Sequence, residues 1–371
     1  MSTHYIYIDD DPDSYKKIQG FENENLSIET VQHEDSWKQQ MTFLKQKESS
    51  IDGLVLDLKL DDLPNGNAQR ADFRGTSLAQ EIRTRQKERV LESFPIVLFS
   101  ANDKVELALE NSGKDLFDIC IDKSDINIES FNKYSPRLIA LSEGYKKLKV
   151  SKRLEEILNT DVSLLDSRFI SEFEELKSAP VHVQSRFLIT EFLEKQGLLI
   201  GEDILAARLG VDKENSKDWE LLKQLLEGAK YTGIFSYGWE RWWAHLVENW
   251  WNELDTNETH LRTTSANLRV EILKKQCGFS NIVAATKIDK ADSDEFWTIC
   301  KGYGKPLDTI DGLLISGQDN LYPWQEPEYV SVDAALKKKG FEQWKGLADV
   351  EKEHFEELKV IFSPKKQVRD E

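Results

Sequence analysis

Chemically active side chains follow four of five short apolar runs near the start of the chain. Carboxylates come after the first and third runs, a hydroxyl after the fourth and an ammonium group close after the fifth. In chain order these residues are Asp9, Asp10, Asp57, Ser100 and Lys123. Carboxylates in one pocket repel each other and require a hard cation such as Mg²⁺, which also accepts phosphoryl oxygens. A carboxylate can then attack a phosphoryl group, while cation, lysine and hydroxyl neutralise its oxygens.

The elements that would gather these side chains are predicted by alternating apolar and helix-like stretches. The apolar runs are short and continuous, which is typical of buried parallel strands. Their alternation with helical segments predicts an α/β fold, a doubly wound (βα)5 unit with a parallel five-stranded sheet. Ligands of such sheets bind at the carboxyl ends of the strands, so the active side chains are expected at one edge. The predicted strands cover 5–8, 26–31, 54–56, 96–99 and 119–121, and helices are predicted at 34–47, around 78–82 and at 130–158.

Acids after apolar runs also have a purely structural use, because loop acids often cap the next helix. Asp11 or Asp13 is expected to do so after the first strand. A single acid at such a place indicates little about function. The whole set, in the right order after the right strands, favours a phosphoacceptor site over coincidence.

Four segments, YIYIDDDP, GLVLDLKL, PIVLFSAND and DICIDKSD, resemble the signature segments of bacterial response-regulator receiver domains. The resemblance covers about residues 3–148. It implies a phosphoryl group received from a histidine kinase, with no enzymatic activity beyond this transfer and slow autodephosphorylation. It also implies that Ser100 binds a phosphoryl oxygen and that Lys123 is the cation of the site.

The same resemblance implies a magnesium site around the phosphoacceptor. Asp57 matches the residue that is phosphorylated. Asp9 and Asp10 match the acidic pair, with Asp10 as the direct Mg²⁺ ligand. The backbone carbonyl of Lys59 matches the third protein ligand of the metal.

Three departures from the family pattern lie near the site. The stretch 61–74 holds an insertion beside Asp57, which is expected to be a lid, a partner contact or a floppy loop. Cys120 stands where the family has a switch aromatic, so the usual coupling between that aromatic and the hydroxyl is in doubt. Ser124 replaces the usual proline after the lysine, and a cis bond is disfavoured there because it costs about 3–4 kcal/mol without proline.

Composition restricts the class of partner. The 371 residues include 49 Lys and Arg against 67 Asp and Glu, a net charge of −18, without a dense basic patch. Such a chain repels phosphate backbones, so nucleic-acid binding is not expected. The three cysteines lack metal-ligand spacing and suit a reducing compartment. No signal peptide or membrane-length apolar run is found, so a soluble, cytoplasmic protein without membrane partners is expected.

The length predicts more than one domain. The first is the receiver at 1–148, followed by a helical linker at 149–165. Residues 166–371 are expected to form a tryptophan-rich, mostly helical α+β domain of unknown type. Within it the patterns predict helices at 167–177, 184–197 and 215–228, a strand at 310–315 and a frayed tail at 364–371.

One C-terminal segment, 231–251, is rich in tryptophan. Its apolar side chains recur at helical spacing, which predicts one apolar helix face. Such a face is either part of the core or a partner-binding groove, because aromatic clusters also anchor interfaces. Base stacking is disfavoured by the acidic charge. The predicted face consists of Trp239, Trp242, Trp243, Leu246, Val247 and Trp250.

The interpretation we prefer is a two-component phosphoacceptor whose C-terminal module binds a protein. In its architecture the chain also resembles receiver proteins of bacterial anti-phage two-component systems, which implies a phosphate sink or relay in defence signalling. Two alternatives stay open: an effector enzyme switched by phosphorylation, and a divergent transcriptional response regulator. For an enzyme, a nucleophile pair could come from Cys277 or Cys300 with His245 or His260.

Overall fold

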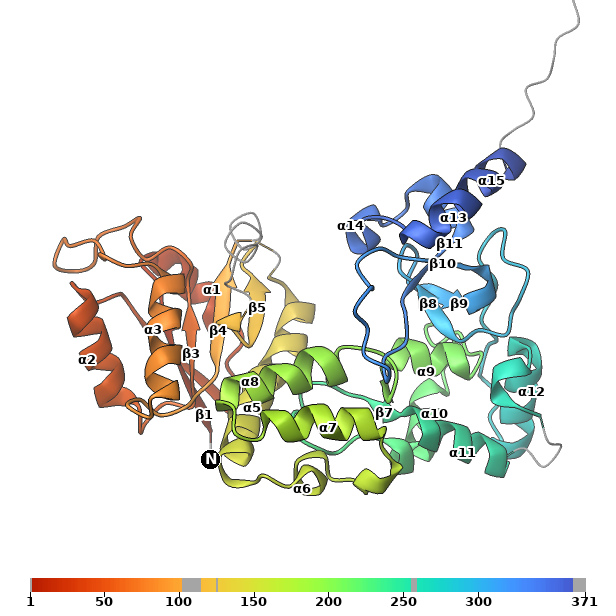
Figure 1. Cartoon of the computed structure of the whole chain (residues 1–371), viewed down its shortest axis with the longest axis horizontal. Helices are drawn as coiled ribbons and strands as arrows, with labels where there is room; N and C mark the ends of the chain where they lie inside the picture. The colour runs from red at the N-terminus through yellow and green to blue at the C-terminus, as the bar shows by residue number, and fades with distance from the viewer. Residues whose placement is uncertain (1, 102–114, 125, 255–258, 363–371) are drawn as a thin grey trace, which may run out of the picture. The chain divides into compact units, whose positions relative to one another are not determined.

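The computed structural model describes residues 2–101, 115–124, 126–254 and 259–362. Figure 1 shows the chain coloured from its N-terminus in red to its C-terminus in blue. The tail predicted at 364–371 lies outside the described residues. No helix of the described part is long and apolar enough to cross a membrane.

The chain divides into two compact units that do not follow a single cut in the sequence. The first contains Met1–Glu191 together with Thr232–Trp239, and the second contains Phe192–Tyr231 and Glu240–Glu371. The domain limits expected from the sequence, at 148 and 165, remain a prediction.

The first unit is built on a parallel five-stranded sheet. Its order is β2-β1-β3-β4-β5, one of the two common doubly wound orders, in which the strand order reverses beside β1. This confirms the α/β fold class and all five predicted strands. The strands are β1 (Thr3–Ile8), β2 (Leu26–Val31), β3 (Gly53–Leu56), β4 (Ile96–Ser100) and β5 (Ile119–Asp122).

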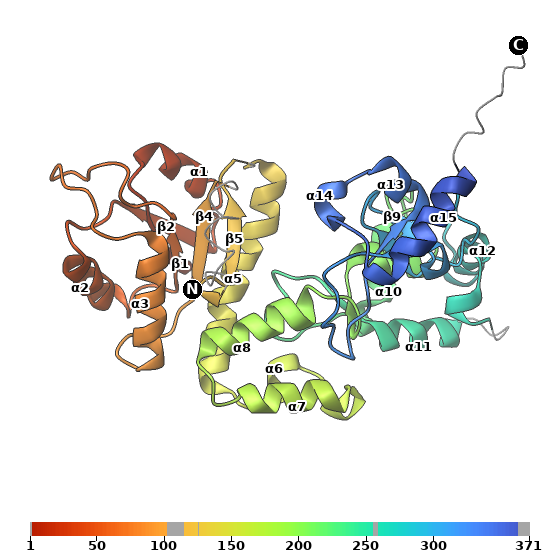
Figure 2. The ribbon, with the colours of Figure 1, turned by 45° about the horizontal axis from the view of Figure 1, so that its top comes forward.

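Helices cover both faces of this sheet, because strand side chains point alternately to opposite faces. Ile6 and Ile8 of β1 pack in one core with Leu44 and Leu78 from two helices. Tyr5, on the other face, donates a hydrogen bond to the backbone of the long helix α5. Figure 2 shows α2 and α3 on one side of the strands and α5 on the other. The helices are α1 (Tyr15–Gln19), α2 (Trp37–Lys47), α3 (Gly75–Lys87) and α5 (Ile128–Val150).

The chain after α5 stays attached to the first unit. The helix predicted at 130–158 is broken after Val150, and α6 (Leu154–Leu158), α7 (Ser167–Leu176) and α8 (Val181–Phe187) follow. A buried network joins α8 to the sheet, because the Asp118 carboxylate accepts hydrogen bonds from Arg83, Tyr145 and Ser185.

The returning segment Thr232–Trp239 packs against α5. A Cβ at Gly144 would lie 2.0 Å from a ring carbon of Phe235, so glycine is required for this close approach. The Arg137 guanidinium lies 4.7 Å from the ring centroid of Trp239 and donates a hydrogen bond to the carbonyl of Gly238. These contacts fix the segment on the helix.

The second unit is mostly helical, with a small mixed sheet, as predicted for the C-terminal part. The sheet has the order β10-β11-β8-β9, and a separate two-stranded sheet pairs β6 with β7. Its strands are β6 (Leu199–Ile200), β7 (Trp242–Trp243), β8 (Thr298–Cys300), β9 (Lys305–Leu307), β10 (Gly312–Leu314) and β11 (Tyr329–Ser331). Its helices are α9 (Glu202–Arg208), α10 (Trp219–Leu225), α11 (Ala244–Leu254), α12 (Ala266–Cys277), α13 (Val332–Lys337), α14 (Phe341–Trp344) and α15 (Lys352–Phe362).

The predicted single tryptophan helix is wrong. Helix α11 begins only at Ala244, and the two tryptophans before it form β7, where Trp243 pairs with Leu199. Trp239 belongs to the segment on α5. Strand pairing and the returning segment override the helical spacing, which is a local signal. Of the predicted face, Trp239, Trp242, Trp243 and Val247 are at most 3% exposed. Leu246 and Trp250 are partly buried and pack against the core of the second unit, so most of this face is core.

Candidate functional site

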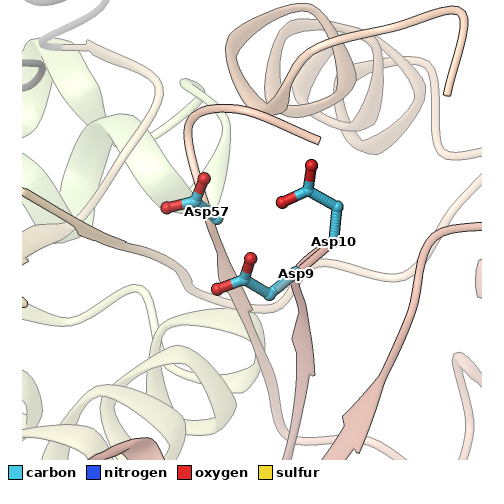
Figure 3. Close-up of side chains that lie close together, drawn as sticks. All are labelled: Asp9, Asp10 and Asp57. Carbon is cyan, nitrogen blue, oxygen red and sulfur yellow. The ribbon is translucent and has the colours of Figure 1, made fainter. Parts of the chain in front are cut away.

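Three carboxylates meet at the carboxyl edge of the parallel sheet. Strands β1 and β3 are neighbours and end at the same level, where the Asp57 amide donates to the carbonyl of Ile8. Asp9 and Asp10 therefore lie beside Asp57, and oxygens of all three lie within 4.8 Å of one another. Figure 3 shows the carboxylates of the three residues facing a common space. All three residues are buried, and each keeps an atom on an open cavity of about 420 Å³.

Lys123 supplies the positive charge of the site. It follows β5, which pairs with β4, and its amide donates to the carbonyl of Ser100. Its ammonium group lies 2.7 Å from Asp57 Oδ1 and 2.5 Å from Asp9 Oδ2. One cation thus bridges two of the three carboxylates, and the cluster keeps an excess of negative charge.

Tyr7 is part of the site and was missed from the sequence. Its hydroxyl donates to Asp9 Oδ2, the oxygen that Lys123 also binds. Its ring lies 5.6 Å from the Lys123 ammonium. Burial and the adjacent Asp9 raise the pKa of Tyr7, so the hydroxyl stays protonated and remains a donor. The sequence signal that could have identified it is its position two residues before Asp9, since residues two apart on a strand point to the same face.

Ser100 presents a hydroxyl that is ready for a ligand. The residue is buried at the end of β4 and lines the same cavity. Its Oγ finds no hydrogen-bond partner among the described residues. A buried polar atom without a partner costs about 1–3 kcal/mol. An oxygen-rich ligand in the cavity would satisfy it, and this fits a phosphoryl group.

Lys59 and Gly75 shape the wall beside Asp57. The Lys59 amide donates to Asp57 Oδ2 at 2.7 Å, and Lys59 lines the cavity. The role of its carbonyl as a metal ligand stays a prediction. Helix α3 begins so close that a Cβ at Gly75 would lie 2.0 Å from the carbonyl oxygen of Asp57. Glycine at this position is therefore what allows the helix to start there.

The electrostatics of the pocket favour a bound cation. The pKa of Asp57 is raised, because burial and the repulsion from Asp9 together outweigh the attraction of Lys123. The pKa of Asp10 is raised mainly by burial, with the charges of Asp9 and Asp57 adding to it. A hard divalent cation would relieve this repulsion, and an all-oxygen donor set suits Mg²⁺. The residues present therefore fit the predicted metal.

Four further residues of the signature segments, or next to them, were singled out from the sequence, and the structure describes all of them. Asp11 caps the turn after β1 by accepting from the amide of Asp13, as expected of one of these two acids. Cys120 lies exposed on β5. No described peptide bond is cis, which agrees with Ser124 in place of proline. Asn102, Asp103 and Asp125 lie outside the described residues.

The insertion at 61–74 is attached to the unit by hydrogen bonds and by buried side chains. Its side chains hydrogen-bond to the segment after β2, and Ala71 and Phe73 are buried in the core. Its first residues reach the cavity, where the Leu63 amide donates to Asp10 Oδ2 at 2.6 Å. This contact gives the Asp10 carboxylate a main-chain partner that the sequence motifs did not predict.

A scan against protein-family models finds no match, and no curated protein matches the chain. Among solved structures, the response regulator LqsR of Legionella pneumophila is 15% identical and the match spans 70% of this chain and 96% of that one, with a TM-score of 0.30. The response regulator RcsB of Salmonella typhimurium is 16% identical over 51% and 92%, with a TM-score of 0.26. A sensor protein of Polaromonas sp. JS666 is 21% identical over 37% and 98%, with a TM-score of 0.26.

The first unit has a parallel sheet of order 2-1-3-4-5 and an acidic cluster with a lysine and a hydroxyl at its carboxyl edge. This combination is the doubly wound α/β fold expected from the sequence, with its acidic site at the edge where such sheets bind ligands.

Proposed function

We propose that the first unit is the phosphoacceptor of a two-component system, with Asp57 accepting a phosphoryl group from a histidine kinase. The observation that carries the proposal is the cavity that combines three buried carboxylates, Lys123 and the Ser100 hydroxyl, which has no hydrogen-bond partner in the described part of the chain. Structural acids capping a loop would not need a buried hydroxyl and an ammonium group aimed at the same space.

The proposed transfer is a displacement at phosphorus. A carboxylate oxygen of Asp57 attacks the phosphorus of a phosphohistidine, the P–N bond breaks, and the imidazole leaves with the electron pair. The product on Asp57 is a mixed acyl phosphate. Lys123 and Ser100 would bind the phosphoryl oxygens. Bound Mg²⁺ supplies charge neutralisation, and the residues that would hold it are Asp10, Asp57 and the carbonyl of Lys59, with Asp9 beside them.

Phosphotransfer from the cognate kinase, or from a small phosphoryl donor, tests this proposal. Phos-tag gels of the full chain should show labelling that requires Mg²⁺ and disappears in Asp57→Asn. The matched control is Asp52→Asn, which removes a carboxylate paired with Lys146 at the surface. Equal labelling of wild type and Asp57→Asn would move the phosphorylation site elsewhere.

The second unit is proposed to bind a protein partner. The whole chain is proposed to act as a phosphate sink or relay in a bacterial defence signalling system. Most of the tryptophan cluster is buried in the core, so it is not proposed as the surface for this partner. A neighbouring gene for a kinase plus a toxic effector would support such a sink, and a lone kinase would favour a regulator. We also propose a cytoplasmic location.

The alternative of a DNA-binding response regulator is disfavoured by the net charge of −18. A gel-shift assay should give no sequence-dependent complex at low micromolar protein. A salt-sensitive, sequence-dependent shift would favour the regulator instead.

The alternative of an effector enzyme lacks support from the cysteines. Cys300 is buried and exchanges hydrogen bonds with Ser331, and Cys277 is half-buried at the end of α12. No described contact joins either thiol to His245 or His260.

A further inference from the structure

One asparagine of the insertion 61–74, Asn65, forms hydrogen bonds with both its side-chain amide group and its side-chain oxygen. The Asn65 amide group donates to Asp35 Oδ1 at 2.6 Å and to the carbonyl of His33 at 3.2 Å. Its side-chain oxygen accepts from the amides of Asn67 and Gln69. Asn65 thus shapes the turn of the insertion and ties it to the segment after β2.

A second contact between the same two segments lies next to the metal site. The ring of His33 is buried, and its Nε2 lies 3.3 Å from the carbonyl oxygen of Leu63. The amide of Leu63 points the other way and donates to Asp10 Oδ2 at 2.6 Å. The other ring nitrogen of His33, Nδ1, lies 2.9 Å from the carbonyl oxygen of Glu34, so the ring contacts both carbonyls. Leu63 therefore lies against the His33 ring on one side and holds the Asp10 carboxylate on the other.

Asp35 is the anchor of this arrangement. Both of its oxygens accept from Asn67, and one also accepts from Asn65. These hydrogen bonds lower the pKa of Asp35, so the carboxylate is ionised at neutral pH and attracts the two amide groups. Without Asp35 or Asn65, the turn beside Leu63 loses its side-chain hydrogen bonds to the segment after β2.

We propose that Asn65 and Asp35 are positioning residues for the Mg²⁺ site, acting on Asp10 through the amide of Leu63. The inference rests on the proposed function, because it concerns the metal of the same site. A hydrogen bond on Oδ2 restrains the rotation of the Asp10 carboxylate, which would hold the cation. Partners of this kind that orient a ligating carboxylate typically change metal affinity by about 10–100-fold when they are lost.

The test is Mg²⁺ titration of the full chain by calorimetry, in wild type and in Asn65→Asp. This substitution keeps the oxygen that accepts from the turn but replaces the donating amide with a charge opposite Asp35. We expect Mg²⁺ affinity to fall by about 10-fold, and the Leu63 amide to exchange faster with solvent in the metal-free protein. The swapped pair, Asn65→Asp with Asp35→Asn, restores an amide facing a carboxylate and should recover most of the affinity.

The control is Asn23→Asp, which adds the same charge at an exposed turn before β2, where the side-chain oxygen likewise accepts from a backbone amide. It should leave Mg²⁺ affinity unchanged. If Asn65→Asp loses the protection of the Leu63 amide but binds Mg²⁺ as wild type does, the positioning role is refuted and the phosphoacceptor proposal stands. If wild type itself binds no Mg²⁺, the proposed metal site fails.

Discussion

Lys123→Met should destabilise the metal-free protein far more than the loss of a surface lysine would. Lys123 is the single described cation bound to the two buried carboxylates of Asp9 and Asp57. Methionine keeps much of the side-chain length without the charge. The two acids are then left facing each other without a cation between them.

The magnitude follows from the distances. Each ion pair at about 2.7 Å is worth roughly 6 kcal/mol at an effective dielectric constant of about 20, but most of this is offset by the cost of burying the ammonium group. What remains after its removal is the repulsion of two carboxylates. The carboxylate oxygens of Asp9 and Asp57 lie within 4.8 Å of each other. At that distance and the same dielectric constant, their repulsion is about 3.5 kcal/mol. We therefore expect a loss of about 3 kcal/mol, at the lower end of the range for breaking a buried pair.

Calorimetry without Mg²⁺ should show the transition of the first unit lowered by about 6–12 °C, the shift expected for a unit of this size. Lys146→Met is the matched control, because Lys146 pairs with Asp52 at the surface, where such pairs contribute at most about 1 kcal/mol. Added Mg²⁺, or a second substitution Asp57→Asn, should recover much of the loss. A metal-free Lys123→Met protein that melts together with the Lys146→Met control would refute the electrostatic reasoning.

Three further outcomes are expected. Burial raises the pKa of Asp10 and of Asp57, so these carboxylates bind protons more readily in the folded metal-free protein than in the unfolded chain. Their contribution to the free energy of unfolding therefore increases as the pH falls from neutral through the raised pKa values. Urea denaturation should accordingly find Asp10→Asn/Asp57→Asn more stable than wild type at pH 7 by a margin that shrinks at pH 5; a constant margin would contradict this. Gly144→Ala should destabilise the first unit by about 1–3 kcal/mol through its overlap with Phe235, whereas Gly228→Ala, which meets no atom within 4 Å, should be nearly neutral in urea melts. Hydrogen exchange with and without beryllofluoride should leave protection of α11 nearly unchanged, as expected for a phosphate store, and altered protection there would identify a switched output.

The strands and the candidate site residues of the first unit could be predicted from the sequence. Strands β1, β3 and β4 contain short continuous apolar runs, which suit positions buried on both faces of a parallel sheet, whereas the edge strand β2 alternates apolar and polar residues. The active side chains directly follow these runs, so the sheet edge that collects them follows from the strand assignment. Asp57, Lys123 and Ser100 were found in this way, and the structure brings them together with Asp9 and Asp10.

Other features were decided by contacts between residues far apart in the chain. The tryptophan segment has helical spacing, but pairing with Leu199 and packing on α5 set its conformation. The return of 232–239 to the first unit depends on Gly144, which lies nearly a hundred positions earlier and carries no local signal for it. The hydrogen bond from Leu63 to Asp10 depends on where the insertion turns back. Local patterns encode which elements form, whereas such contacts depend on side-chain and main-chain groups that become neighbours only once the elements have packed.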